Sequence, residues 1–574
     1  MNNSFRIALN QVNLKTGDIN SNIENMKSGI LMAQETGAEI VVFPELSLIG
    51  YAVNDLLKKR NFINDNINAM NEIIEFASRK VPVVIFGCAD VKTSLYNSAI
   101  VASEGKIVGV CGKNNLELKG EFNESSYFCS DPRFNVFEIK GVRFGISVGG
   151  DVYKNVDLEH KFRRSGTGVI IDLDSPVYEM GKLQKIERDI ASLSDRTGMC
   201  ICQCNNVGGK DDLIFTGRSS VTDQFGNLIA LGKAFDEDFL IADISPDFPF
   251  EIKKNGLGEC FEETEIINIT YHEEVKNEIY PKIAVQPGDI DEEIYQALRL
   301  SIKDYIKNNG FKGVILGLSG GIDSALVAAL CVNAIGKENV LGLLMPSKYS
   351  SQGSVDDSLK LAENLGMRTM TISINDLFEK YVEVLNPEFS EIEMKNQNDT
   401  TEENIQARIR GNYLMAFSNK LGYLVMNTGN KSECATGYST LYGDTVGGFA
   451  PISDLYKKYV YSLSKKINEI EGKEIIPVEI IDKEPSAELS PDQKDSDSLP
   501  EYETLDIILD LLIERDICTE AVISMGFDEV VVNKVNRLIR INEYKRRQEP
   551  LGPKISTCKF GTDRIYPITN GYKY

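Results

Sequence analysis

A glycine-rich turn between an expected strand and an expected helix constrains the fold of this chain more than any other feature. The apolar run 313–318 predicts a buried strand, residues 324–334 predict a helix, and the turn that joins them reads Gly317, Leu318, Ser319, Gly320, Gly321, Ile322, Asp323, Ser324. This order opens a βαβ unit. Glycines let successive N–H groups face one anion, and the helix adds its positive N-terminal end. The turn therefore predicts a site for a phosphate chain.

The aspartate inside this turn adds a cation to the prediction. Asp323 would repel phosphate unless a cation lies between them, so Mg²⁺ is implied. The turn is not a Walker loop, because it lacks the Gly-x-x-x-x-Gly-Lys-Ser/Thr pattern. A tight glycine turn with Asp323 as a solvated helix cap is the alternative, but turn chemistry alone rarely requires Ser-Gly-Gly-x-Asp-Ser in this position.

Strand and helix patterns also alternate through the first part of the chain. Expected strands cover 6–11, 38–43, 81–88, 97–101, 144–148, 169–173 and 199–204, and expected helices cover 21–37 and 55–80. The periodicity is lost over about 246–286, and a new helix is expected at 290–309. We therefore predict an α/β protein with a first domain at 1–245, a linker at 246–285 and a second domain at 286–574. Two polar stretches, 386–403 and 490–501, are expected to be mobile loops.

Composition excludes several classes of function. The net charge of the 574 residues is -23, which disfavours nucleic acid or anionic lipid as a partner. The chain has two histidines, which disfavours catalysis by several imidazoles and metal sites rich in histidine. The eleven cysteines form no CxxC framework, and Cys200, Cys202 and Cys204 alternate as in a buried strand. No apolar run resembles a signal peptide or membrane span, so we expect a cytoplasmic protein that acts on small molecules.

The octet 317–324 resembles the pyrophosphate loop of N-type ATP pyrophosphatases, and the segments after it resemble those of NAD synthetases. These segments are 403–411, 427–433, 437–444, 448–452 and 559–569, so that the resemblance covers about 285–574. It implies a doubly wound, Rossmann-like parallel sheet that belongs to the adenine nucleotide alpha hydrolase type. It also implies amidation of deamido-NAD to NAD: ATP adenylates the nicotinate carboxylate, pyrophosphate leaves, and ammonia displaces AMP.

The resemblance also implies roles for individual residues. Asp323 and Glu433 match the magnesium ligands, and Thr428 and Lys457 match positions that contact ATP together with the octet 317–324. Lys457 would otherwise be part of a solvated helix face. The positions that match the deamido-NAD site are Asn404, Arg408, Glu433, Tyr438, Ser439, Thr440, Leu441 and Lys559. The family's synthetase domains pair and share this site, so a homodimer or larger homo-oligomer is expected.

The first domain resembles the nitrilase superfamily, whose fold is an αββα sandwich, over about residues 4–245. Glu45 matches the general base, Lys113 the catalytic lysine and Glu124 its supporting carboxylate. In the larger NAD synthetases such a domain is a glutaminase that supplies ammonia. The third motif departs from the family, because Gly149 takes the place of the nucleophilic cysteine and Gly150 that of its acidic neighbour.

Without a thiolate, Glu45 and Lys113 have no nucleophile to activate, so we predict a silent glutaminase domain and a synthetase that uses ammonia. Ser147 is the candidate for an unorthodox nucleophile if glutamine dependence persists. Lys210 takes a position where the family usually has Gln, which indicates that glutamine recognition is no longer required of this domain. A non-catalytic binding or scaffold protein is a further alternative, which the intact motifs disfavour. The last alternative is another adenylating enzyme, either one that thiolates tRNA or one that forms GMP. The negative net charge disfavours the enzyme that acts on tRNA.

Overall fold

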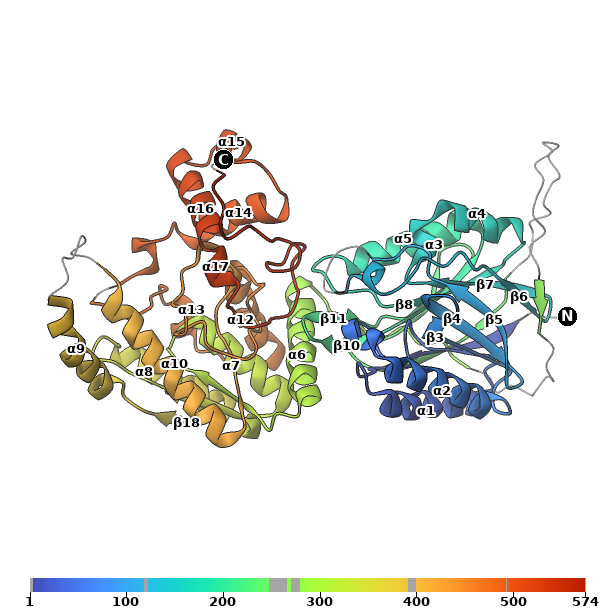
Figure 1. Cartoon of the computed structure of the whole chain (residues 1–574), viewed down its shortest axis with the longest axis horizontal. Coiled ribbons are helices and arrows are strands. Elements are labelled where there is room, and N and C mark those ends of the chain that lie inside the picture. Colours follow the sequence, from blue (N-terminus) through green and yellow to red (C-terminus); the bar gives the residue numbers. More distant parts are fainter. Residues whose placement is uncertain are drawn as a thin grey trace. The chain divides into compact units, whose positions relative to one another are not determined.

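A computed structural model describes residues 4–117, 122–246, 266–269, 279–390, 399–491 and 493–572. The chain forms two compact units. The first comprises 1–210 and 214–287, and the second comprises 211–213 and 288–574. None of the helices formed by the described residues is both long and apolar enough to cross a lipid bilayer. Each unit is an α/β fold, as the sequence predicts (Figure 1).

Two mixed sheets form the first unit. One has the order β14-β1-β2-β3-β4-β5 and the other β13-β12-β9-β8-β7-β6-β15. The bounds in the first sheet are β1 (Phe5–Gln11), β2 (Ile40–Val42), β3 (Val83–Val91), β4 (Leu95–Ser103), β5 (Lys106–Gly112) and β14 (Asp238–Ile244). Those in the second are β6 (Val136–Ile139), β7 (Val142–Val148), β8 (Val169–Asp174), β9 (Cys200–Asn205), β12 (Ser220–Thr222), β13 (Leu228–Leu231) and β15 (Ile266–Asn268). A separate hairpin joins β10 (Val207–Lys210) to β11 (Leu213–Thr216).

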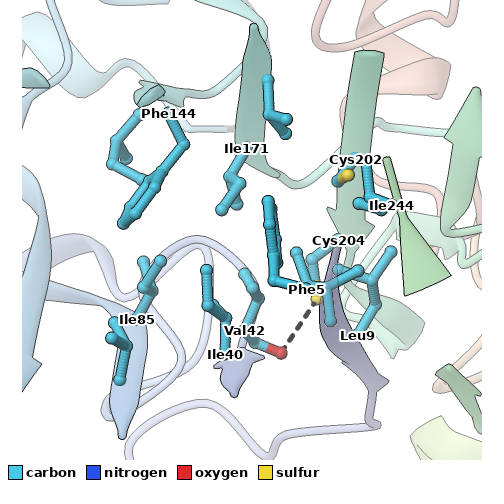
Figure 2. Packing of buried hydrophobic residues seen from close by; sticks show 14 of the residues in the cluster. Phe5, Leu9, Ile40, Val42, Ile85, Phe144, Ile171, Cys202, Cys204 and Ile244 are labelled. Carbon is cyan, nitrogen blue, oxygen red and sulfur yellow. Dashed lines mark hydrogen bonds between the residues drawn. The ribbon is translucent and has the colours of Figure 1, made fainter. Parts of the chain in front are cut away.

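The two sheets pack face to face through one apolar core. Figure 2 shows Phe5, Leu9 and Val42 of the first sheet opposite Phe144 and Ile171 of the second. Cys200, Cys202 and Cys204 belong to this core, which confirms their expected packing role. The two-residue period of β-strands therefore sends alternate side chains of both sheets into a shared interior.

Helices cover the outer faces of both sheets and complete the expected αββα sandwich. The first sheet is covered by α1 (Ile19–Glu35) and α2 (Arg60–Ala77), and the second by α3 (Asp151–Lys154), α4 (Val156–Arg164) and α5 (Leu183–Thr197) (Figure 1). Phe162 and Leu193 belong to the apolar layer under the second group. Two 3₁₀ turns, Asn54–Lys58 and Glu124–Ser126, complete the unit.

The second unit is built on a four-stranded parallel sheet of order β18-β17-β16-β19. Its strands are β16 (Val314–Gly317), β17 (Val340–Leu344), β18 (Arg368–Thr371) and β19 (Leu424–Val425). The helices are α6 (Ile290–Asn309), α7 (Ile322–Ile335), α8 (Gln352–Leu365), α9 (Asn375–Ser390), α10 (Thr401–Leu421), α11 (Lys431–Thr436), α12 (Lys457–Glu471) and α13 (Val478–Asp482). The expected strand–turn–helix at 313–334 is therefore confirmed as β16 and α7.

A helical subdomain with its own apolar core follows in the chain. It contains α14 (Tyr502–Leu509), a π-helical turn (Asp510–Glu514), α15 (Thr519–Ser524), α16 (Glu529–Ile541) and α17 (Glu543–Arg546). Short 3₁₀ turns lie at Lys337–Asn339 and Asp495–Asp497. Ala435 of α11 and Tyr456 before α12 are part of this core, so the helical subdomain packs directly beside elements that line the pocket described below.

The polar stretch 386–403 differs from the loop that its composition predicts. Residues 386–390 end α9, and 401–403 begin α10, where Glu402 and Glu403 occupy the first turn. Carboxylates at a helix N-terminus are favoured by its dipole, which explains helix where polarity alone indicated a loop. Residues 391–398 of this stretch, residue 492 of the stretch 490–501, and 247–265 and 270–278 of the linker lie outside the described residues. Mobility of the two polar stretches stays a prediction.

Candidate active sites

The glycine-rich turn forms a tight hydroxyl-lined loop between β16 and α7. Gly320 has a φ of +77°, and a Cβ there would collide with the backbone of Ser354 in α8. Ser324 Oγ lies 3.2 Å from Ser319 Oγ and donates to the Gly321 carbonyl over 3.0 Å. Only glycine meets both requirements at position 320, because it tolerates positive φ and needs no room for a side chain.

Two carboxylates and a lysine from three distant segments meet beside this loop. Lys457 Nζ lies 2.5 Å from Asp323 Oδ2 and 3.6 Å from Glu433 Oε1. Asn430 Nδ2 donates to Asp323 Oδ1 over 2.9 Å, and the Asn430 side chain also caps α11 by accepting from the Glu433 N–H over 3.1 Å. The structure thus brings together Asp323 and Glu433, the expected magnesium ligands, and Lys457, an expected ATP contact.

The charges of this cluster act strongly on one another. Burial and then the Asp323 carboxylate raise the pKa of Glu433 to about 8. Burial works against the charge of Lys457, but Asp323 foremost and then Glu433 raise the pKa of this lysine. One lysine cannot neutralise two carboxylates, so Glu433 keeps its proton near neutral pH, and a bound cation would allow it to ionise.

The cluster opens into a pocket of about 320 Å³ at the carboxyl ends of the parallel strands. Ligands of open α/β sheets bind at this edge. The predicted site residues that line it are Gly317, Leu318, Ser319, Gly320, Gly321, Ile322, Asp323, Ser324, Thr428, Glu433, Tyr438, Ser439 and Lys457. The other walls are formed by residues 344–346 at the end of β17, by residues of α10 and by the segment 483–489.

The remaining residues expected at the deamido-NAD site lie outside this pocket. Thr440 Oγ1 donates to Asn404 Oδ1 over 2.7 Å, and Arg408 Nε donates to the Leu441 carbonyl over 3.2 Å. These four therefore form one group that continues from Tyr438 and Ser439. Lys559 Nζ donates to Asp212.

In the first unit, a buried lysine joins the two expected carboxylates. Lys113 Nζ lies 2.8 Å from Glu45 Oε1 and 2.9 Å from Glu124 Oε2. Asn97 Nδ2 bridges the same two side chains, at 2.7 Å from Glu45 Oε1 and 2.9 Å from Glu124 Oε1. Glu45 Oε2 is buried and accepts no hydrogen bond from the described residues. The three predicted residues thus form one water-excluded cluster, with Asn97 as a fourth member.

Gly149 directly follows β7, at a sharp turn into α3. Its φ is +63°, and a Cβ on Gly149 would overlap Cε and Nζ of Lys113. The lysine therefore occupies the space in which a side chain at position 149 would begin. Ser147 Oγ accepts from the Val152 N–H over 3.1 Å, and so caps the first turn of α3.

Electrostatics around Gly149 are set by burial. Burial raises the pKa of Glu45 and of Glu124, and Lys113 lowers both. Burial disfavours the charge of Lys113, yet Glu45 above all raises its pKa well above the ordinary value. Lys113 thus offsets part of the cost of burying Glu45 and Glu124.

Sequence reasoning missed the residues that hold these clusters in place. Asn97 lies buried inside β4, and a polar residue just before the apolar run 99–102 was the available signal. Asp151 accepts from the Asn114 N–H over 2.5 Å and from the Asn115 N–H over 2.9 Å, and so fixes the turn after Lys113. Asn430 was visible only as part of a motif, without its contact to Asp323.

The fold and the two clusters define a two-part class of protein: an αββα sandwich with a buried lysine between two glutamates, and an α/β unit with a glycine-rich loop at its pocket. Comparisons agree. Residues 6–248 match the family model for carbon-nitrogen hydrolase, and residues 294–549 match that for NAD synthase. The glutamine-dependent NAD(+) synthetase of Thermotoga maritima is 40% identical over 99% of both chains, and that of Acinetobacter baylyi is 39% identical over 99% of both.

A solved structure gives the same result. The glutamine-dependent NAD+ synthetase from Acinetobacter baumannii, in complex with adenosine diphosphate, is 36% identical, covers 99% of both chains and has a TM-score of 0.73. The chain belongs to the glutamine-dependent NAD(+) synthetase family. Its activity is the ATP-dependent formation of NAD.

Proposed function

We propose that this member of the family forms NAD with ammonia as the direct nitrogen donor, and that its first unit does not hydrolyse glutamine. The observation that carries the proposal is Gly149. A carbon–nitrogen hydrolase of this type requires a thiolate that attacks the amide carbon, and glycine offers no such atom. Lys113 fills the space where that side chain would start. Ser147 is no substitute, because its hydroxyl is engaged at the start of α3.

The second unit is proposed to adenylate deamido-NAD in the pocket of about 320 Å³. The loop 317–324 and Lys457 would neutralise the phosphates, and Thr428 would contact ATP. Asp323 and Glu433 fit Mg²⁺, since two carboxylates plus substrate phosphates are its usual ligands and the pair already holds one cationic group. When bound, Mg²⁺ would offset charge that develops on the departing pyrophosphate.

Deamido-NAD is proposed to extend from the pocket along a short path of polar residues. Tyr438 and Ser439 would receive the reacting end, and Asn404, Arg408, Thr440 and Leu441 the rest of the dinucleotide. Arg408 and Leu441 are joined by a hydrogen bond, as are Asn404 and Thr440, which supports one continuous surface. Lys559 would need to leave Asp212 in order to join it.

Two further parts of the proposal concern the protein as a whole. We propose a homodimer or larger homo-oligomer, as the family resemblance implies. We also propose that the enzyme acts in the cytoplasm, where its thiols stay reduced. The ten described cysteines form no disulfide with one another, which agrees with that compartment.

The test compares nitrogen donors. NAD and AMP formation are measured with deamido-NAD, ATP and Mg²⁺, supplied either with ammonium or with glutamine freed of ammonia. Ammonium should support turnover, and glutamine should give less than about 1% of that rate because acyl transfer lacks its nucleophile. Turnover with glutamine that matches glutamate release would refute the proposal.

Glutamine dependence through another nucleophile is the alternative. Its support is that the related enzymes are named glutamine-dependent. Ser147→Ala separates the two: it should leave ammonium-dependent turnover unchanged in either case, and it should abolish glutamine-dependent turnover only if Ser147 is that nucleophile. The double change Gly149→Cys with Gly150→Glu is the matching gain-of-function test.

A further inference from the structure

The start of α12, where Lys457 lies, is held by side chains from two other helices. Lys457 is the first residue of α12. Its N–H donates to Ser432 Oγ of α11 over 3.0 Å, and the N–H of Lys458 donates to Asp506 Oδ2 of α14 over 2.8 Å. The first N–H groups of a helix have no partner inside the helix. These two acceptors therefore fix the place at which α12 begins.

One carboxylate, that of Asp506, joins the start of α12 to α11. Ser432 Oγ donates to Asp506 Oδ1 over 2.5 Å, so the hydroxyl that holds the Lys457 N–H is itself held by Asp506. Ser432 directly precedes Glu433 in α11. Both Ser432 and Asp506 are fully buried, and the described lining of the pocket includes neither of them. Asp506 therefore acts on a ligand in the pocket through the residues that it holds.

The same face of α14 also supports the charged end of Lys457. Tyr502 lies one helical turn before Asp506, so both side chains share one face of α14. Lys457 Nζ lies over the Tyr502 ring, 5.1 Å from its centre. The Tyr502 hydroxyl donates to Asp495 Oδ2 over 3.0 Å, and Asp495 lines the pocket. The helix α14 thus contacts both the backbone segment and the ammonium group that present Lys457 to the pocket.

We propose that Asp506 is a positioning residue for the ATP site: it fixes the start of α12 against α11, and so holds Lys457 at its distance from Glu433. A displacement of about 1 Å in a charged group costs much of its interaction with a ligand, even when the change that causes it lies far from the reacting atoms. The inference rests on the proposed contact of Lys457 with ATP, and it adds a residue of the helical subdomain to that site. Asp506 itself takes no part in the chemical step.

A double-mutant cycle tests this by calorimetry on the full-length protein, with a non-hydrolysable ATP analogue and Mg²⁺ as the probe. Asp506→Leu keeps the side-chain volume but loses both acceptors, so it should weaken binding of the analogue about tenfold. In a Lys457→Met background the same change should weaken binding less than twofold, because the group that Asp506 positions is gone. Asp506→Asn can still accept from the Lys458 N–H and should cause a smaller loss than Asp506→Leu.

The control variant is Ile508→Ala, which truncates a buried apolar residue of the same helix and core without removing a hydrogen bond. It should lower the melting temperature but leave the affinity for the analogue within twofold, at a temperature at which every variant is folded. An equal loss of affinity in Ile508→Ala, or an equal effect of Asp506→Leu in both backgrounds, would assign Asp506 to stability alone and overturn the inference. If Asp506→Leu does not fold, Ser432→Ala in the same cycle decides.

Failure of the ATP site itself gives a different result from failure of this inference. If Lys457→Met alone binds the analogue as the parent does, the proposed contact of Lys457 with ATP is wrong. If Lys457→Met weakens binding and Asp506→Leu does not, the ATP contact stands and only the positioning role of Asp506 is refuted.

Discussion

At the scale of single residues, the carboxylates of Asp323 and Glu433 should be the side chains whose charge matters most for AMP formation. Asp323→Asn and Glu433→Gln should each reduce AMP formation by more than about 100-fold, because phosphate charge is left unneutralised in the transition state. Near neutral pH, Glu433→Gln should leave the melting temperature unchanged, because the raised pKa of Glu433 already keeps this carboxyl largely protonated, whereas Asp323→Asn should lower it, because buried Lys457 loses its closest carboxylate. The measurement is AMP release with ammonium, and Glu471→Gln, an exposed change on α12, is the control. Turnover near the parent rate would remove the residue from the metal site.

A second prediction at this scale concerns pH and the first unit. Burial and then Asp174 raise the pKa of Asp172 to about 7, and Gln203 Nε2 donates to Asp172 Oδ2 over 3.3 Å. The folded protein therefore holds this proton more tightly than the unfolded chain. The contribution of Asp172 to stability is present at low pH and is lost as pH rises from about 4 to about 7.

Asp172→Asn removes that titration. Its free energy of unfolding should be close to the parent's at pH 5 and exceed it by roughly 1–3 kcal/mol at pH 8. Denaturant unfolding at several pH values, followed by far-ultraviolet circular dichroism, measures the difference. A gap between the two proteins that does not change with pH would contradict the assignment.

At the scale of elements, the N-terminus of α11 links helix capping to the phosphate cluster through Asn430. Asn430→Ser keeps an oxygen that caps the helix but loses the donor to Asp323, whereas Asn430→Ala loses both. Both variants should raise the KM for ATP several-fold by a similar factor. Only Asn430→Ala should also lose about 1 kcal/mol of stability. Parent-like ATP use by Asn430→Ser would confine Asn430 to its capping role.

At the scale of the whole molecule, removal of the buried lysine of the first unit should affect stability, whereas removal of the buried lysine of the second unit should affect catalysis. Lys113→Met leaves Glu45 and Glu124 buried without their cation, so it should destabilise the first unit by about 3–5 kcal/mol. Ammonium-dependent turnover by the folded fraction should stay within about twofold of the parent, because no step of the synthetase reaction uses Lys113. Lys457→Met should show the opposite pattern, with turnover lost.

Unfolding curves and ammonium-dependent rates on the same samples test this division. If folded Lys113→Met were inactive with ammonium, the first unit would take part in the synthetase reaction, and its proposed silence would be wrong. Parent-like turnover of Lys457→Met would remove that lysine from the ATP site.

The sequence alone determined the elements whose signals are local. The loop 317–324 combines an apolar strand, glycines and a helix start within a few residues, and the expected strand and helix are found as β16 and α7. Strands β1, β3, β7, β8 and β9 follow from apolar runs. The glycine at position 149, on which our proposal of a silent first unit rests, is likewise read directly from the sequence.

Only the tertiary structure decided which distant residues meet. Asp323, Glu433 and Lys457 lie on three separate segments, and Lys113 reaches the space beside Gly149 from another sheet. Position and direction of such side chains depend on how sheets and helices pack, and no periodicity of 2 or 3.6 residues encodes that. For the same reason Asn97 drew no attention in the sequence, because it matters through a partner far away in the chain, the Glu45 carboxylate.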